Sequence, residues 1–397
     1  MYLSTTLLAA CAFFYCVFAR RMGTLPISGA MIFITLGFIL GPQCLGIIEL
    51  ESAGSLVRTL ADFTLALLLF ADAASLKVST LKSVKNLAIR MLLVGLPLTI
   101  LLGFAAARWL FPEFGLWECA ILATALAATD AALGKPVVTN TAVSERLRTT
   151  ANVESGLNDG LCVPLLLLFI ALANRPQMHE TTELAMELFL SEIGLGLLFG
   201  VAITWLGTRL LTLAVARDWA SPKWVPMSIS ILALLCFLVA QDLHGSGYIA
   251  AFVGGVTFSL LNHKQVHDLV NDTEESGEIL GMLTWILFGV LAYHTVSHQP
   301  AAEDWIYAIL SLTVIRIFPA MLVLSGTGLN WTSKFFLAWF GPRGLASVVF
   351  AFIIINSQVP QAEKIAAIIS CTILLSVVLH GVSALPFIKK FSKALNG

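Results

Sequence analysis

Charged residues are scarce in this sequence, and their scarcity excludes an ordinary soluble protein. Lysine, arginine, aspartate and glutamate together make up 12% of the 397 residues, whereas hydrophobic residues make up 58%. Soluble domains contain about 25% charged residues, so a chain this apolar could not cover its own surface in water. We therefore expect a membrane protein.

Cysteine patterns that would hold a disulfide framework or a metal are missing as well. The seven cysteines are widely spaced, mostly within apolar runs, and none belongs to a Cys-x-x-C motif or a Cys/His cluster. Buried free thiols are expected, and no cofactor. The formal net charge of −1 does not indicate a nucleic-acid partner, and none is expected. The first apolar stretch precedes Arg20 and Arg21 instead of following a basic region, so a signal peptide is not expected either.

Long apolar segments are what the sequence has in abundance. Runs of about 17–25 residues, the length that crosses the hydrocarbon core of a bilayer, recur along the chain with short connections. They predict an all-α polytopic membrane protein with about 13 transmembrane helices and a short cytoplasmic tail at 389–397. The expected helices are 2–19, 24–41, 54–72, 87–107, 117–140, 149–173, 185–213, 224–241, 246–261, 278–296, 303–325, 333–356 and 363–388.

The basic residues fall unevenly on the two sides of these helices. With the N-terminus outside, sixteen of the 23 lysines and arginines lie on the cytoplasmic side and four on the other. Positive charge is enriched in cytoplasmic loops. The asymmetry predicts an outside N-terminus, an odd number of helices and a cytoplasmic C-terminus.

A few charged residues fall within the predicted spans. A charge at bilayer depth costs at least a few kcal/mol, so such residues face a cavity or a partner and mark function. The six residues are Asp130, Lys135, Glu154, Asp159, Arg316 and Arg343.

The segment 152–160 carries the densest group of polar residues. On a helix, Ser155 and Asp159 lie on one face, and Glu154 and Asn158 lie on the adjacent one. Their carboxylate, hydroxyl and carboxamide oxygens are the ligands that hard cations prefer. We interpret the segment as the wall of a cation site; the alternative is a polar loop whose first residue caps the helix.

Residues 127–136 interrupt the preceding span. Gly134 and Pro136 continue a helix poorly, because proline removes a backbone hydrogen bond and clashes with the preceding turn. Transporters place ion sites at such breaks. Thr129 could offer an oxygen to an ion, and Asp130 could cap a half-helix where the dipole favours negative charge. The alternative is a re-entrant or short helix with Asp130 at the surface.

A second break, in the sequence Gly341-Pro342-Arg343-Gly344, interrupts the span 333–356. Two broken segments at comparable positions of two halves point to an inverted-repeat transporter. We predict two inverted repeats of six, helices 1–6 and 8–13, whose fifth members are broken, crossing helices. The expected divisions are 1–173 for the first repeat, 185–213 for the linking helix and 224–388 for the second repeat.

Arg316 lies in an apolar helix and needs an anionic partner there. From the residues alone, Glu154, Asp130 and Asp159 all remain candidates. The alternative is an arginine that snorkels from a helix end.

Taken together, these motifs resemble those of prokaryotic NhaP-type sodium/proton antiporters, which are relatives of the animal sodium/hydrogen exchangers. The resemblance covers essentially the whole chain and rests on Thr129-Asp130, on 154–160 and on 341–346, in this order and at these depths. It implies a homodimer in which each protomer has a dimerisation domain and a mobile core domain. In one departure, Ala131 stands where the family has a proline.

The resemblance also implies roles for single residues. Asp159 would take either the cation or the proton, with Ser155 and Thr129 supplying further oxygens. Asp130 would contribute its backbone oxygen and cap a helix, and Glu154 would make a nearby contact.

The resemblance implies three further assignments. Arg316 would pair with Glu154, and Arg343 would steady the second broken helix. Asn158 occupies the position that is an aspartate in electrogenic relatives, and it cannot titrate.

The predicted function is therefore antiport of Na⁺ or Li⁺ against H⁺, electroneutral and by alternating access, with cation and proton competing for one buried carboxylate. K⁺/H⁺ antiport by the same architecture is the alternative. The expected partners are monovalent cations, protons and membrane lipid, in a prokaryotic inner membrane and in the service of pH homeostasis.

Two other function classes fit the sequence poorly. A gated cation channel would need a repeated filter segment, and none is present. An intramembrane enzyme could use Ser246, but no histidine or lysine base lies convincingly at the same depth.

Overall fold

The computed structural model describes residues 2–22, 27–42, 44–48, 50–75, 86–130, 133, 140, 142–174, 180–262, 266–297 and 300–395. Within these residues all regular secondary structure is helical, which confirms the all-α prediction. In this part of the chain, seven helices are long and apolar enough to cross a membrane, and shorter apolar helices accompany them. The seven are Asn86–Leu110, Glu145–Ala173, Leu190–Ala216, Trp224–Asp242, Leu269–Ala292, Ala302–Val323 and Ala362–Ser392.

The chain divides into two compact units, and α3 (Leu50–Ala74), α8 (Glu145–Ala173) and α12 (Val266–Ser297) contribute a part to each. The first unit comprises Met1–Ala61, Val84–Asn158 and Gly281–Gly397. Its other helices are α1 (Tyr2–Met22), α2 (Gly29–Leu40), η1 (Met91–Gly95), α5 (Leu96–Leu110), α6 (Leu116–Ala125), α13 (Ala302–Leu312), α14 (Val314–Val323), α15 (Trp331–Trp339), α16 (Leu345–Asn356) and α17 (Ala362–Leu395).

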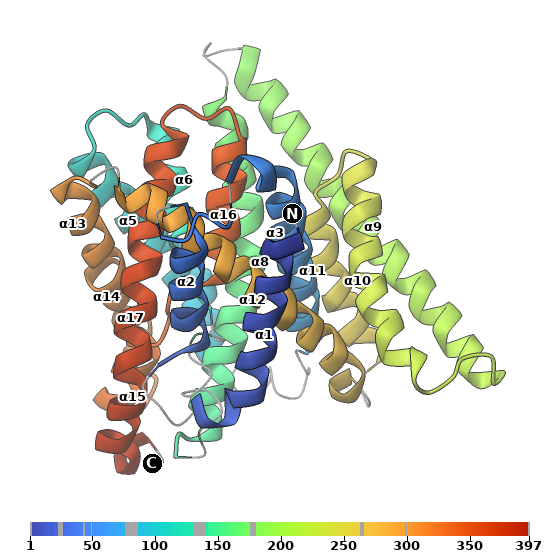
Figure 1. Ribbon diagram of the computed structural model, residues 1–397. Coiled ribbons are helices and arrows are strands. Elements are labelled where there is room, and N and C mark those ends of the chain that lie inside the picture. The colour runs from blue at the N-terminus through green and yellow to red at the C-terminus, as the bar shows by residue number, and fades with distance from the viewer. Residues whose placement is uncertain are drawn as a thin grey trace. The chain divides into compact units, whose positions relative to one another are not determined.

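The second unit comprises Asp62–Ser83 and Asp159–Leu280 and is built on three helices that lie side by side, α9 (Glu180–Ala216), α10 (Trp224–Asp242) and α11 (Gly247–Leu261) (Figure 1). Glycine allows the close approach of α9 to α11, because a Cβ on Gly200 would lie 2.6 Å from the carbonyl oxygen of Ala250. Each unit draws on both predicted repeats. The repeat boundaries themselves stay a prediction.

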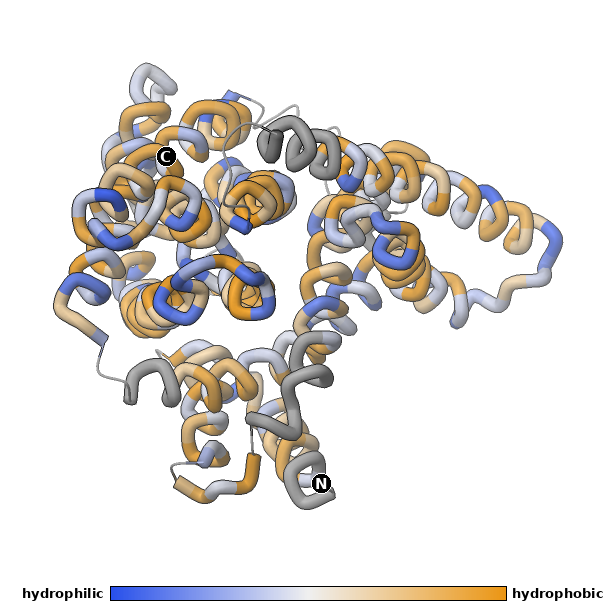
Figure 2. The backbone as a smooth tube through the Cα atoms, turned by 90° about the horizontal axis from the view of Figure 1, so that it is seen from above, coloured by the Kyte–Doolittle hydropathy of each residue, from blue (hydrophilic) through white to orange (hydrophobic). Residues whose placement is uncertain are grey.

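Hydrophobic residues predominate along the helices (Figure 2). Large apolar side chains stay exposed on the outer face of α9, where Leu206 and Leu210 are each 62% exposed. In water such a surface would be unfavourable, whereas in a bilayer it meets lipid tails.

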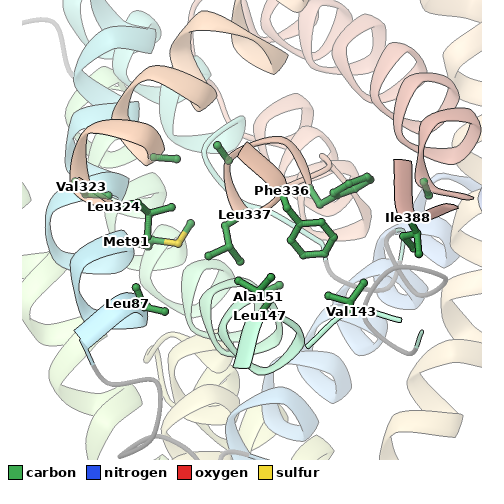
Figure 3. Close-up of a cluster of buried hydrophobic side chains, with 14 residues drawn as sticks. Leu87, Met91, Val143, Leu147, Ala151, Val323, Leu324, Phe336, Leu337 and Ile388 are labelled. Carbon is green, nitrogen blue, oxygen red and sulfur yellow. The ribbon is translucent and has the colours of Figure 1, made fainter. Parts of the chain in front are cut away.

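A buried apolar cluster in the first unit packs α15 against α8. Phe336 and Leu337 of α15 lie beside Leu147 of α8, Met91 of η1 and Ile388 of α17 (Figure 3). The cluster lies next to the end of α15, where the second break begins. Packing in this core therefore sets the position of that break relative to α8.

Two predicted helices are less regular than their apolar runs suggest. The span expected at 87–107 contains a π-helical turn, in which the Leu96 amide donates to the Met91 carbonyl; Pro97 follows at once and lacks the donor that would continue a regular turn. The span expected at 303–325 is interrupted at Thr313, with φ −111° and ψ −93°. Pro319 lies in the helix that follows, where it likewise removes an intrahelical donor.

The C-terminal tail expected at 389–397 is helical in its described part, because α17 continues to Leu395. Regular helix also begins earlier than expected at 278–296, where α12 starts at Val266. Lys135, Pro136 and Ala131 lie outside the described residues, so the expectations for them are not compared with the structure.

Candidate functional site

The first broken segment begins where α6 ends, at Ala125. Residues 126–130 have no regular helical structure. This agrees with the break predicted at 127–136, as far as the described residues reach. The hydroxyl of Ser347 on α16 donates to the Ala125 carbonyl over 2.9 Å. This bond satisfies one of the carbonyls that a helix end leaves without a partner.

The second broken segment runs from Phe340 to Gly344, between α15 and α16. Phe340 has φ −81° and ψ 58°, and the Gly341 amide donates to the Trp339 carbonyl over 2.8 Å. These values describe an inverse γ-turn. The chain therefore leaves α15 through one tight, hydrogen-bonded turn.

The two broken segments cross each other, as predicted for the fold. The Asp130 amide donates to the Pro342 carbonyl, and the Leu345 amide donates to Asp130 Oδ2, each over 2.9 Å. The Asp130 carboxylate thus caps the N-terminus of α16, where the helix dipole favours negative charge. A Cβ on Gly344 would overlap this carboxylate, so the crossing requires glycine there.

The polar face of α8 binds the first broken segment directly. The Ser155 hydroxyl donates to the Thr129 carbonyl over 2.7 Å. Asn158 Nδ2 donates to the Ala127 carbonyl over 3.0 Å and to Thr129 Oγ1 over 3.1 Å. Asn158 and Thr129 are each 1% exposed. The carboxamide therefore acts as a hydrogen-bond donor that holds the oxygens of the break in place.

Asp159 follows Asn158 on α8 and is also buried, with 9% of its surface exposed. It lies one helical turn after Ser155, so local helix geometry places the two side chains on the same face. A buried carboxylate with a hydroxyl on one face is a donor set suited to a hard cation or a proton.

Glu154 is paired with Arg316 on the adjacent face of α8. The guanidinium contacts both carboxylate oxygens, over 2.8 and 3.0 Å, and both residues are at least 94% buried. Gly341 makes room for the arginine, since a Cβ there would lie 2.5–2.7 Å from guanidinium atoms. Of the three carboxylates that the sequence left open, the structure places Arg316 against Glu154.

Arg343 is fully buried and connects the first broken segment to the end of α13. Its guanidinium donates to the carbonyls of Ala127 and Ala128 in the first broken segment and to that of Ser311 near the end of α13, over 3.2–3.3 Å. A cation at the carbonyl ends of helices is favoured by their dipoles. The resemblance implied that Arg343 steadies the second break, whereas its guanidinium binds the first.

The structure therefore brings Thr129, Asp130, Ser155 and Asn158 together, and it places the Glu154–Arg316 pair on the neighbouring helix face. Their roles as ion ligands stay predictions. Sequence reasoning did not single out three contributors to the crossing: Ser347, Ser376 and His380. A serine and a histidine four residues apart in the apolar span 363–388 were the one available signal.

The chain matches the family model described as "Sodium/hydrogen exchanger, transmembrane" over residues 6–390. It is 24% identical over 396 residues to the K(+)/H(+) antiporter NhaP2 of Shewanella sp. (strain MR-4), covering 96% of this chain and 65% of that protein. It is 23% identical over 272 residues to the probable Na(+)/H(+) antiporter C3A11.09 of Schizosaccharomyces pombe, covering 64% of this chain and 36% of that protein.

Among solved structures, the fold is similar to that of the sodium proton antiporter MjNhaP1 from Methanocaldococcus jannaschii at pH 8. The TM-score is 0.78 at 18% identity, and the match covers 96% of this chain and 99% of the other. At this identity the likeness establishes the fold alone. The chain spans about two thirds of the length of the Shewanella relative.

Proposed function

This chain belongs to the sodium/hydrogen exchanger family, and from that premise we propose that it is a secondary active antiporter, which exchanges a monovalent cation for protons across a membrane. The family consists of multi-pass membrane transporters and not of enzymes.

The observation that carries the proposal is the buried carboxylate of Asp159 on the polar face of α8. Desolvation favours the protonated form of a buried carboxylate, whereas a bound cation favours the ionised form. The side chain therefore holds H⁺ or the cation, but not usefully both. Competition for one binding group is sufficient to couple the movement of the cation to that of the proton.

The neighbouring groups are already engaged, which supports a one-for-one exchange. Glu154 is tied to Arg316, and the amide of Asn158 donates to two oxygens and cannot titrate. If only the loaded forms cross readily, one proton exchanges for one monovalent cation. We therefore propose electroneutral exchange, driven by the two concentration gradients.

We propose Na⁺ or Li⁺ as the cation. The resemblance of Thr129-Asp130 and of 154–160 and 341–346 to the motifs of sodium/proton antiporters supports this choice. K⁺ is the second candidate, because the Shewanella relatives are K(+)/H(+) antiporters by name. The further proposals are a homodimer, a prokaryotic inner membrane with the N-terminus outside, and a role in pH homeostasis.

The test is ion-driven proton flux into proteoliposomes that contain a pH-sensitive dye. Proton flux after addition of Na⁺ or Li⁺, equal at imposed potentials of either sign, is expected. Flux with K⁺ alone, measured with a membrane potential that is set without K⁺, would identify K⁺ as the transported cation. Flux that follows the potential would contradict electroneutrality, and no cation-driven flux would contradict antiport.

Asp159→Asn tests the carboxylate. It removes the group that titrates and keeps its size, so we expect loss of exchange with the protein still folded. The matched control is Asp242→Asn at the exposed end of α10, which should exchange as the wild type does. Retained exchange in Asp159→Asn would contradict the assignment.

A further inference from the structure

A buried histidine reaches the turn that opens the second broken segment. His380 lies on α17 and is 2% exposed. Its Nε2 lies 3.0 Å from the Trp339 carbonyl oxygen, and its Nδ1 lies 3.2 Å from Ser376 Oγ and 2.9 Å from the Ser376 carbonyl oxygen. The ring also packs on the Trp339 indole, with centroids 5.0 Å apart.

The contacts require a proton on Nε2. A carbonyl oxygen can only accept, so a bond to Trp339 needs Nε2–H. In the neutral ring with that proton, Nδ1 accepts from the Ser376 hydroxyl; in the charged ring, Nδ1 donates to the Ser376 carbonyl. Both forms donate to the Trp339 carbonyl. The neutral ring with its proton on Nδ1 would instead place the unprotonated Nε2, an acceptor, against the carbonyl oxygen, also an acceptor.

The Trp339 carbonyl is a critical acceptor, because it closes α15 and starts the γ-turn. It receives the Gly341 amide over 2.8 Å and His380 Nε2 over 3.0 Å. The two donors use both lone pairs of one oxygen. Removal of the imidazole would leave the turn with a single bond at a buried position.

The same histidine is connected by a short series of hydrogen bonds to side chains of the proposed ion site. The Arg343 amide donates to Ser376 Oγ over 2.7 Å, and the Arg343 guanidinium binds the Ala127 carbonyl, which also accepts from Asn158. The γ-turn and Ser376 therefore fix the backbone that aims Arg343 at the first broken segment.

We infer that His380 is a positioning residue for cation exchange, which holds the second broken segment through the Trp339 carbonyl and thereby the oxygens of the first. This inference rests on the proposed antiport. It assigns His380 no contact with the ion.

Two substitutions separate the bond from general packing. In His380→Gln the amide nitrogen overlays Nε2 and can donate to Trp339, whereas in His380→Asn the shorter amide overlays Nδ1 and cannot. Ser383→Ala is the matched control, because Ser383 accepts from Trp339 Nε1 over 3.1 Å between the same two helices, through the indole and not through the carbonyl of the turn.

The first measurement is hydrogen–deuterium exchange of peptides that cover residues 340–345, in the purified full-length protein. His380→Asn should speed exchange at these amides at least tenfold, whereas His380→Gln and Ser383→Ala should stay within about threefold of the wild type. This readout does not depend on transport. Unchanged protection in His380→Asn would overturn the inference.

The second measurement is the Na⁺ concentration for half-maximal proton flux in proteoliposomes. We expect it to rise at least fivefold in His380→Asn and to be restored by His380→Gln. Equal impairment in His380→Gln and His380→Asn would show a packing role and overturn the inference. If His380→Asn fails to fold, His380→Gln still tests the inference. Faster deuterium exchange at residues 340–345 in a folded His380→Gln would overturn it. Absence of flux in the wild type would refute the proposed function alone, since the deuterium measurement still tests the bond.

Discussion

The Glu154–Arg316 pair allows a quantitative test of how dry the region around α8 is. The variants are Glu154→Gln, Arg316→Met and the double variant. The two contacts of 2.8 and 3.0 Å join residues that are 3% and 6% exposed, so water screens the pair little. Two unit charges about 4 Å apart attract by about 4 kcal/mol at an effective dielectric constant of 20.

Loss of one partner should cost more than loss of both. Removal of one member of a buried ion pair destabilises by about 3–5 kcal/mol, because an uncompensated charge remains. We expect this full cost in Glu154→Gln, since a guanidinium cannot give up its proton. Arg316→Met should also be destabilising, because it leaves the buried Glu154 carboxyl without its partner. The double variant should lose only about 1–2 kcal/mol. The coupling free energy is the amount by which the two single losses together exceed this value, and it should be at least about 3 kcal/mol.

The assay is unfolding by SDS titration in mixed micelles, followed by the fluorescence of the nine tryptophans. The free energies of unfolding of the four proteins form a double-mutant cycle. The exposed Glu113–Lys364 pair, 2.6 Å apart, is the matched control and should couple by less than about 1 kcal/mol. A coupling below about 1 kcal/mol for Glu154–Arg316 would refute the reasoning, because it would mean that water reaches the pair.

Three further predictions follow from single contacts. Asn158→Asp should reduce exchange at least tenfold instead of producing electrogenic transport, because a carboxylate would face two oxygens that now accept from the amide; voltage-dependent flux at the wild-type rate would contradict this. Gly344→Ala should destabilise by about 1–3 kcal/mol in the SDS titration, because its Cβ overlaps the Asp130 carboxylate; an unchanged midpoint would show that the two broken segments can move apart without cost. The hydrogen bond from Lys364 lowers the pKa of Glu113 below the ordinary 4.5, so the small stability it adds is present above pH 4.5 and is lost as the pH falls through the lowered value; Lys364→Gln should abolish this acid-dependent part and leave exchange intact.

The sequence predicts the features whose cost is local to one residue. A charge in an apolar span is unfavourable wherever the span packs, so Asp130, Glu154 and Arg343 stood out without any knowledge of the fold. The breaks were predicted for the same reason, because glycine and proline disrupt a helix through their own backbone.

The choice of partners is not local, and there sequence reasoning needed a resemblance or was incomplete. Three carboxylates were open to Arg316 until packing of α14 against α8 decided between them. The guanidinium of Arg343 binds the first break rather than its own, because the crossing brings the carbonyl ends of α6 and α13 to it.

The interruption at Thr313 and the role of His380 were not predicted at all. Hydropathy measures apolar character and does not register a lost hydrogen bond, so the span 303–325 was expected to be one helix. A lone histidine in an apolar helix has no pattern to mark it. Its contact with the Trp339 carbonyl arises only when α17 packs against α15.

The bonds of Arg343 also predict which distances stay constant during the proposed transport. One rigid planar group is bonded to the first broken segment and to the end of α13, and the backbone of the same residue is bonded to α17. We therefore expect these three elements to move together as one block. Spin labels on exposed positions of α6 and α13 should keep a single, narrow distance distribution whether Na⁺ is present or absent, however far the block itself moves.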